Sequence, residues 1–129
     1  MRPATGISRY REMQAVTATP AELVVLLYEA AIAALRDARR ALEQKNAAAA
    51  HGAIVKAQKI VGELLGILDL EQGGEVARNL RDLYLFLLDH LLQTNLRKDG
   101  EMLAQAIQLL EPLRDAWSHL AGKAGGKRN

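Results

Sequence analysis

Apolar residues recur at steps of three and four along four stretches of the chain, and short polar or glycine-containing segments separate these stretches. Such spacing places the apolar side chains on one face of an α-helix. Residues with β-branched side chains are sparse and never alternate with polar ones over the length of a strand, so strands are not expected. The predicted helices run from about Pro20 to Glu43, from Ala47 to Glu71, from Glu75 to Leu96 and from Glu101 to Leu120.

Each predicted helix carries one apolar stripe that we expect to face a common core. Four helices joined by short turns predict an all-α fold, an antiparallel up-down four-helix bundle with a short N-terminal arm. The stripes, in chain order, are Leu23, Leu27, Ala30, Ala34, Ala38 and Ala41; Ile54, Ala57, Val61, Leu64 and Leu68; Val76, Leu80, Leu83, Leu87 and Leu91; and Leu103, Ile107, Leu110 and Trp117.

Capping residues mark where these helices begin. Thr19 is followed by Pro20 and then, three residues after the threonine, by Glu22, which is the spacing of a capping box with proline at the first helical position. Asn46 and Asp99 are the corresponding N-cap candidates for the second and fourth helices. These signals divide the chain into an arm over 1–16, a bundle over 17–121 and a disordered basic tail over 122–129.

Two features inside the helices modify this picture. Pro112 lacks an amide hydrogen and crowds the preceding turn, so we expect a kink in the last helix. Three glycines, Gly52, Gly62 and Gly66, lie within the second helix. They either allow close approach of another helix or soften this one.

The third predicted helix is more apolar than a bundle helix needs to be. Six consecutive residues, Leu83 to Leu88, are apolar and cover every direction around the helix, whereas a bundle helix needs a single stripe. In the second helix Ile60, Leu65 and Ile67 also lie off the main stripe. The surplus predicts contact with another segment, a second copy or a partner. The alternative is an unusually apolar helix at the centre of the bundle.

The N-terminal arm carries its own pattern. Ile7, Tyr10, Met13 and Val16 recur at steps of three, which suits a short amphipathic turn. Because Pro20 separates the arm from the first helix, the arm could lie in an apolar groove and shield it.

Charge and composition exclude several classes of protein. The formal net charge is +2, and the tail residues Lys123, Lys127 and Arg128 supply more than this excess, so the body is nearly neutral and nucleic-acid binding is not expected. The chain has no cysteine, which excludes disulfides, thiol catalysis and cysteine-bound zinc. Neither a signal peptide nor a membrane-spanning segment is predicted, so we expect a cytoplasmic protein without membrane insertion.

Enzymatic motifs are missing from the sequence. His51, His90 and His119 are not preceded by glutamate at the spacing that di-iron bundles use, and no zinc-protease, phosphate-binding or dinucleotide motif occurs. We expect His51 and His119 on the surface and His90 packed or on the surface. No catalytic residue, metal or cofactor is predicted.

Four sequence blocks resemble the FliS family of flagellin-specific export chaperones. They follow one another in order over 10–117. Thr94, Pro112 and the alanine run from Ala47 to Ala50 depart from the family pattern. The blocks are Tyr10 with the segment from Val16 to Leu23 and the pair Leu27-Tyr28; Ile54 to Leu64; Asn79 to Tyr84; and Leu91 to Asn95 with Asp99, followed by Leu110 and Leu113 to Trp117.

This resemblance implies a function that the periodicity only suggests. FliS proteins bind the disordered C-terminal segment of flagellin, prevent its premature polymerisation and assist type III flagellar export, without catalysis. We expect the same partner here, the flagellar export apparatus as a further one, and leave a homodimer open. The predicted partner-binding residues are Ile7, Tyr10, Val16, Ile60, Leu64, Tyr84, Leu88, Leu91 and Asn95.

A sharper distinction separates core anchors from groove residues. Leu27, Leu64 and Trp117 are expected to anchor the bundle, whereas Ile60, Tyr84 and Leu88 are expected to be partly exposed in the groove. The alternative function is a structural bundle that forms homo-oligomers through its apolar surface.

Overall fold

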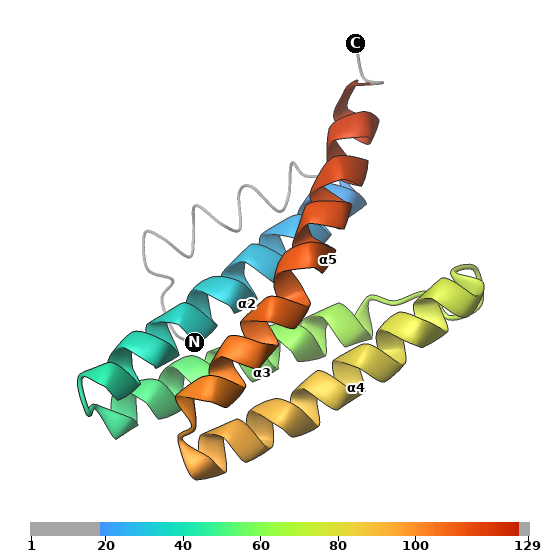
Figure 1. Cartoon of the computed structure of the whole chain (residues 1–129). Coiled ribbons are helices and arrows are strands. Elements are labelled where there is room, and N and C mark those ends of the chain that lie inside the picture. The colour runs from blue at the N-terminus through green and yellow to red at the C-terminus, as the bar shows by residue number, and fades with distance from the viewer. Residues whose placement is uncertain (1–18, 127–129) are drawn as a thin grey trace, which may run out of the picture.

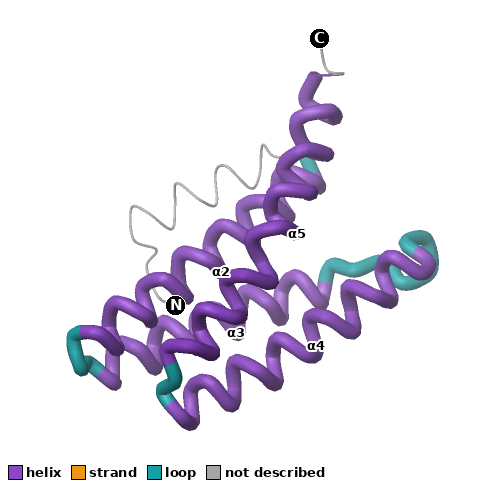
Figure 2. Tube along the Cα trace, viewed as in Figure 1, coloured by secondary structure: helices purple, strands orange, loops and turns teal. Residues whose placement is uncertain are grey.

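The computed structural model describes residues 19–126, and all regular structure within this range is helical. The helices are α2 (Pro20–Glu43), α3 (Ala47–Gly66), α4 (Gly74–Arg97) and α5 (Gly100–Gly126). α2 and α4 each pack against both α3 and α5. The short connections reverse the chain direction at each end, so the fold is the expected all-α four-helix bundle (Figures 1 and 2).

Local capping explains where the helices begin. The Thr19 hydroxyl oxygen accepts a hydrogen bond from the Glu22 amide at 3.2 Å, and Pro20 occupies the first turn. Asn46 Oδ1 accepts from the Ala49 amide at 3.1 Å at the start of α3. Asp99 Oδ1 accepts from the Glu101 amide at 2.9 Å at the start of α5. All three predicted N-caps are confirmed.

The connection between α3 and α4 begins earlier than the sequence indicated. α3 ends at Gly66 rather than near Glu71, and the Gln72 amide donates to Asp69 Oδ1 at 3.0 Å, which closes a separate turn. Gly73 is required there, because a Cβ atom at this position would lie 2.6 Å from the Asp69 carbonyl oxygen. The aspartate turn therefore ends the helix before its apolar pattern ends.

The last helix is longer than predicted. α5 continues through Pro112 to Gly126 instead of ending near Leu120, so 122–126 of the expected tail are helical. The predicted kink at Pro112 stays a prediction, and 127–129 and the arm lie outside the described residues.

The buried face of α2 overlaps the predicted stripe in part, because Ala34, Ala38 and Ala41 are buried as expected. Leu23, Leu27 and Ala30 are partly exposed. The buried side chains of α2 are Tyr28, Ala31, Ile32, Ala34, Leu35, Ala38 and Ala41. The predicted stripe and the observed buried face differ by a small rotation about the helix axis. Both sets of residues have the spacing of three and four that one face of a helix requires, so the spacing alone could not distinguish them. Elsewhere in the bundle, Ile54, Leu64, Leu87 and Leu110 are buried as expected.

Arrangement of the helices leaves one end of the bundle open. α5 runs alongside α2 while α4 runs alongside α3, so α4 and α5 diverge away from their shared turn at Lys98 (Figure 1). The start of α2, the end of α3 and the start of α4 lie toward the diverging end.

The first helix cap can be tested directly. Replacing Thr19 by Ala removes the acceptor for the Glu22 amide, and we expect the free energy of unfolding to fall by about 1 kcal/mol. Chemical denaturation measures this change. Thr19→Ser retains the hydroxyl and serves as the control, so an equal loss in both variants would contradict the capping role.

Two adjacent residues of α4 separate core from surface. Leu87 is fully buried and Phe86 is 56% exposed. Leu87→Ala should lower the free energy of unfolding by about 2–5 kcal/mol through lost burial and a cavity. Phe86→Ala should change it by no more than about 0.5 kcal/mol. Equal destabilisation in denaturation experiments would show that Phe86 is part of the core.

Candidate functional site

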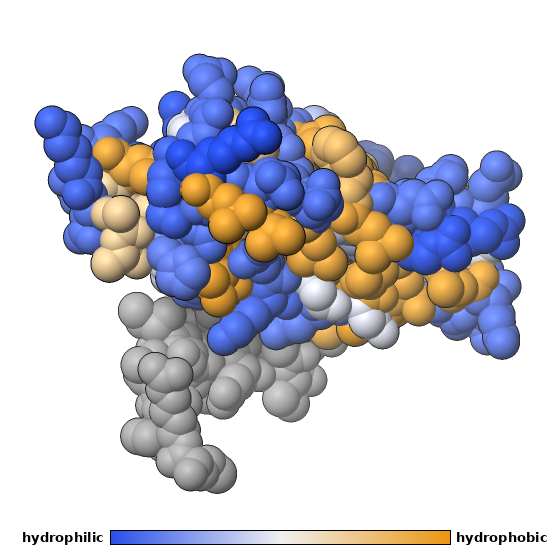
Figure 3. Space-filling model, turned by 90° about the horizontal axis from the view of Figure 1, so that it is seen from below, coloured by the Kyte–Doolittle hydropathy of each residue, from blue (hydrophilic) through white to orange (hydrophobic). Residues whose placement is uncertain are grey.

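A row of leucines runs along the outer surface of α4. Leu85, Leu92 and Leu96 are 50%, 48% and 72% exposed, and the half-buried Leu88 lies between them at the same helical spacing. We call these four residues the α4 apolar row. In the view from below, where α4 lies, apolar side chains form a band along this face between hydrophilic flanks (Figure 3). The predicted apolar surplus of this helix is therefore largely at the surface.

The apolar row borders α3. Asn95 lies one turn beyond Leu92, and its side-chain amide donates to the His51 ring nitrogen at 2.9 Å across the α3–α4 contact. The Lys98 ammonium donates to Asn95 Oδ1 at 2.6 Å. The bond between Asn95 and His51 joins the end of α4 to α3, beside the α4 apolar row.

The opposite flank of α4 faces α5 and is also apolar. The rings of Phe86 and His90 stack with centroids 5.9 Å apart, and His90 Nε2 lies 2.8 Å from the Met102 carbonyl oxygen of α5. Leu109 adds a partly exposed side chain beside them. Hence α4 presents apolar surface on both sides of its buried face.

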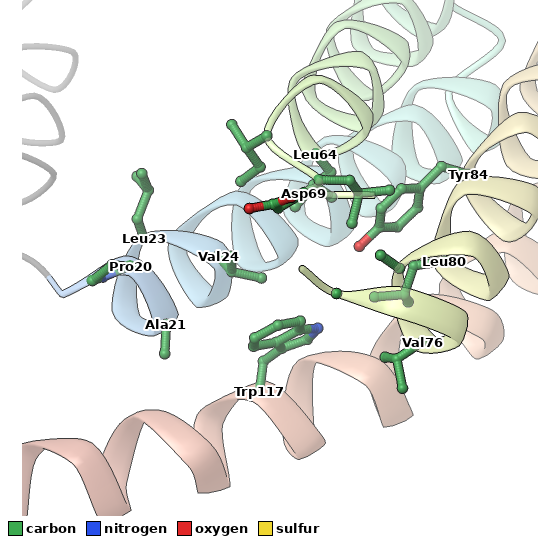
Figure 4. Close-up of a pocket in the computed structure, with 14 residues that line it drawn as sticks. Pro20, Ala21, Leu23, Val24, Leu64, Asp69, Val76, Leu80, Tyr84 and Trp117 are labelled. Atoms are coloured by element: carbon green, nitrogen blue, oxygen red, sulfur yellow. The ribbon is translucent and has the colours of Figure 1, made fainter. Parts of the chain in front are cut away.

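A pocket of about 370 Å³ occupies the open end of the bundle. Val24 of α2, Leu80 and Tyr84 of α4, and Trp117 of α5 line it, and their side chains converge on the same space (Figure 4). Asp69, from the α3–α4 connection, is the single charged side chain among the described lining residues. The pocket is thus an apolar cavity with one acidic group at its edge.

Two buried hydroxyls join the helices beneath this pocket. The phenolic oxygens of Tyr28 and Tyr84 lie 2.5 Å apart, and both residues are almost fully buried. Burial, followed by the hydrogen bond with Tyr84, raises the pKa of the Tyr28 hydroxyl above its usual range, while the Trp117 indole acts in the opposite direction. Burial likewise raises the pKa of the Tyr84 hydroxyl. Both phenols therefore remain protonated at neutral pH.

The predicted binding residues fall into distinct environments. Ile7, Tyr10 and Val16 lie outside the described residues. Ile60 and Tyr84 are 8% and 1% exposed, so the prediction that they are partly exposed is wrong. For Ile60 the reason is that its side chain belongs to the buried core cluster, together with Ala57, Val61 and Leu64 of the same helix.

Of the remaining predicted residues, Leu88 is half-buried as expected, and Leu91 is fully buried in the core. Leu64 is buried but contributes to the pocket wall, as does Tyr84. Asn95 is half-buried and bonded to α3. Leu27 and Trp117, expected as anchors, are half-buried and pack against the core cluster.

Several surface and pocket residues were not identified from the sequence. Leu85, Phe86, Leu92 and Leu96 are the large exposed side chains of α4, and the run from Leu83 to Leu88 was the signal that pointed to this helix. The pocket residues come from four separate segments of the chain. No local pattern could have placed them together.

Two further kinds of site, a metal-binding cluster and a membrane-spanning helix, are absent from the described residues. Within residues 19–126 no group of three or more histidine, aspartate or glutamate side chains could hold a metal ion. No helix in the same range is both long and apolar enough to cross a bilayer. The arrangement is suited to burying apolar side chains of another segment.

Comparison with known proteins agrees with this geometry. Residues 3–124 match the family described as "Flagellar protein FliS". The flagellar secretion chaperone FliS of Salmonella typhimurium is 36% identical over 129 residues, covering 96% of each chain. The corresponding chaperone of Bacillus subtilis is 31% identical over 108 residues, covering 84% of this chain and 80% of its own. The chain belongs to the FliS family of flagellar secretion chaperones, a family of chaperones and not of enzymes.

Proposed function

We propose that this chaperone binds the disordered C-terminal segment of flagellin in the cytoplasm, prevents its premature polymerisation and assists its type III flagellar export. The α4 apolar row is the observation that supports this proposal most strongly. Leu85, Leu92 and Leu96 are large apolar side chains left in water on one continuous face. A face of this kind favours a partner protein that covers it.

An amphipathic helix is the form of client that fits the row best. Apolar side chains that recur every three or four residues on a client helix could pack against leucines with the same spacing on α4. These leucines are Leu85, Leu88, Leu92 and Leu96. A disordered segment loses conformational entropy when it folds on the chaperone, so it must bury a large apolar area to bind. The row and the pocket together supply apolar surface along one helix and at the open end of the bundle.

The N-terminal arm is proposed as a replaceable cover for this surface. The regular spacing of Ile7, Tyr10, Met13 and Val16 supports this role. Pro20, the first residue of α2, lines the pocket, so the arm is attached at the pocket edge. A client that displaced the arm would gain the same apolar contacts.

A structural bundle that forms homo-oligomers through the apolar row is the second candidate function. The same exposed leucines favour it, because they could pack against a second copy. Such a protein would not bind a flagellin peptide. The flagellar export apparatus as a further partner stays a prediction.

Calorimetric titration with the C-terminal peptide of flagellin tests the proposal. We expect the wild-type protein to bind, and Leu92→Gln to weaken binding by about tenfold or more, because the client would then cover a polar side chain. Folding should change little, since Leu92 is 48% exposed.

Leu120→Gln is the matched control for this titration. Leu120 is 52% exposed, lies on α5 and belongs neither to the α4 apolar row nor to the lining of the pocket. Its replacement should leave peptide affinity unchanged. Self-association of the wild-type protein without peptide binding would instead favour the structural bundle.

Removal of residues 1–16 tests the arm. If the arm covers the apolar surface in most molecules, its deletion should raise the rate of peptide association by about threefold or more, because the competent state becomes more populated. Stopped-flow mixing measures the rate, and a hydrophobic dye should also bind more. An unchanged rate together with unchanged dye binding would exclude the cover.

A further inference from the structure

A buried hydrogen bond between two tyrosines lies at the wall of the pocket. The phenolic oxygens of Tyr28 and Tyr84 are 2.5 Å apart, and by distance alone either could be the donor. A phenol both donates and accepts, so the surroundings of each hydroxyl decide the direction of the bond.

The position of the hydroxyl protons follows from burial. Tyr28 is 0% exposed and lies in the core, so a proton that did not point to Tyr84 would be buried without an acceptor. Such an unpaired donor is strongly unfavourable. Tyr28 therefore donates to Tyr84.

The remaining proton belongs to Tyr84. Its hydroxyl points into the pocket from the α4 side (Figure 4). Among the described residues this hydroxyl has no hydrogen-bond partner besides Tyr28. An apolar pocket thus contains a donor on its wall that a bound molecule can satisfy.

We propose that Tyr84 determines client specificity by donating this hydrogen bond to a neutral acceptor, a side-chain amide or hydroxyl that an amphipathic client helix inserts into the pocket among its apolar residues. This inference rests on the proposed function. The occupant is a client helix carrying asparagine, glutamine, serine or threonine at the inserted position.

The requirement for a neutral acceptor follows from the pocket lining. Asp69 is exposed at the edge of the cavity, and no cationic side chain is among the described lining residues. A carboxylate would meet a like charge there and lose its hydration. A purely apolar side chain would displace water from Tyr84 and leave the donor unpaired, and sites of this kind reject ligands that lack the hydrogen-bonding group.

Two phenylalanine variants test the proposal. Tyr84→Phe removes the donor at the pocket wall, and Tyr28→Phe removes the same atom from the same bonded pair but leaves the Tyr84 proton in place. We expect Tyr84→Phe to weaken calorimetric binding of the flagellin C-terminal peptide by about fivefold or more, a loss in the range of a hydrogen bond. Tyr28→Phe should retain the wild-type affinity within about twofold. Thermal melting of both variants identifies any shared loss of stability.

A scan of the peptide identifies the acceptor without relying on the stability of the variants. Replacing each asparagine, glutamine, serine and threonine of the peptide by alanine should reveal one position that weakens binding to the wild-type protein. The same peptide replacement should not weaken binding to the Tyr84→Phe variant any further, because the two changes remove the same hydrogen bond in a double-mutant cycle. Equal peptide affinity for the wild type and Tyr84→Phe, with no such position in the scan, would overturn this inference and leave the proposed function in place.

Other outcomes assign the pocket differently. Failure of the wild-type protein to bind the peptide would overturn the proposed function and this inference with it. A change in self-association on Tyr84→Phe, at unchanged peptide affinity, would assign the pocket to a second copy. Tyr84→Phe could also weaken client binding although no position of the peptide scan does so. The hydroxyl would then have a structural role, and this result also contradicts the proposal.

Discussion

Close packing on α2 is the constraint from which the rest of the structure follows. Most of its buried positions are alanines, namely Ala31, Ala34, Ala38 and Ala41, and both α3 and α5 pack against this helix. Small side chains allow helix backbones to approach closely. α3 and α5 are thereby held on α2, while α4 completes the bundle from the opposite side. The leucines and the phenylalanine on the outer face of α4 are then left uncovered, and the interior at its diverging end is incompletely filled.

The Tyr28–Tyr84 contact connects α2 and α4, one of the two diagonal pairs of helices that do not pack against one another. It spans the bundle diagonally from α2 to α4, through an otherwise apolar cluster. A polar pair in such a position is favourable only when its geometry is satisfied, so it also specifies how α4 is placed. Placement of α4 in turn determines the orientation of the exposed leucines. The buried polar pair and the apolar outer face are thus parts of one arrangement.

Local signals in the sequence predicted the helices and their starts well. Thr19, Asn46 and Asp99 act through contacts within a few residues, which is information that the sequence carries directly. The buried face of α2 was harder to identify, because an alanine- and leucine-rich helix offers two stripes with the same spacing. Tyr28 is buried in the core rather than Leu27 because its hydroxyl contacts Tyr84 of α4, a tertiary contact that the local sequence does not show. The pocket was not predictable, since its walls meet only after the helices have packed.

The run from Leu83 to Leu88 shows both the use and the limit of the pattern. Its composition indicated that α4 carries more apolar surface than a core requires, and exposure of Leu85 and Phe86 agrees. Periodicity could not determine which members face outward, so Tyr84 was expected at the surface and is buried instead. Assigning individual residues needed the helix rotation that neighbours impose.

Trp117 gives the pocket a built-in spectroscopic reporter. It is the single tryptophan of the chain, and its indole lies on the pocket wall in contact with the core cluster. Indole emission responds to the polarity around the ring, so filling the cavity with apolar side chains should shift the fluorescence of this protein to shorter wavelength. Occupancy of the open end can therefore be followed by light alone, in an unlabelled chaperone and in real time.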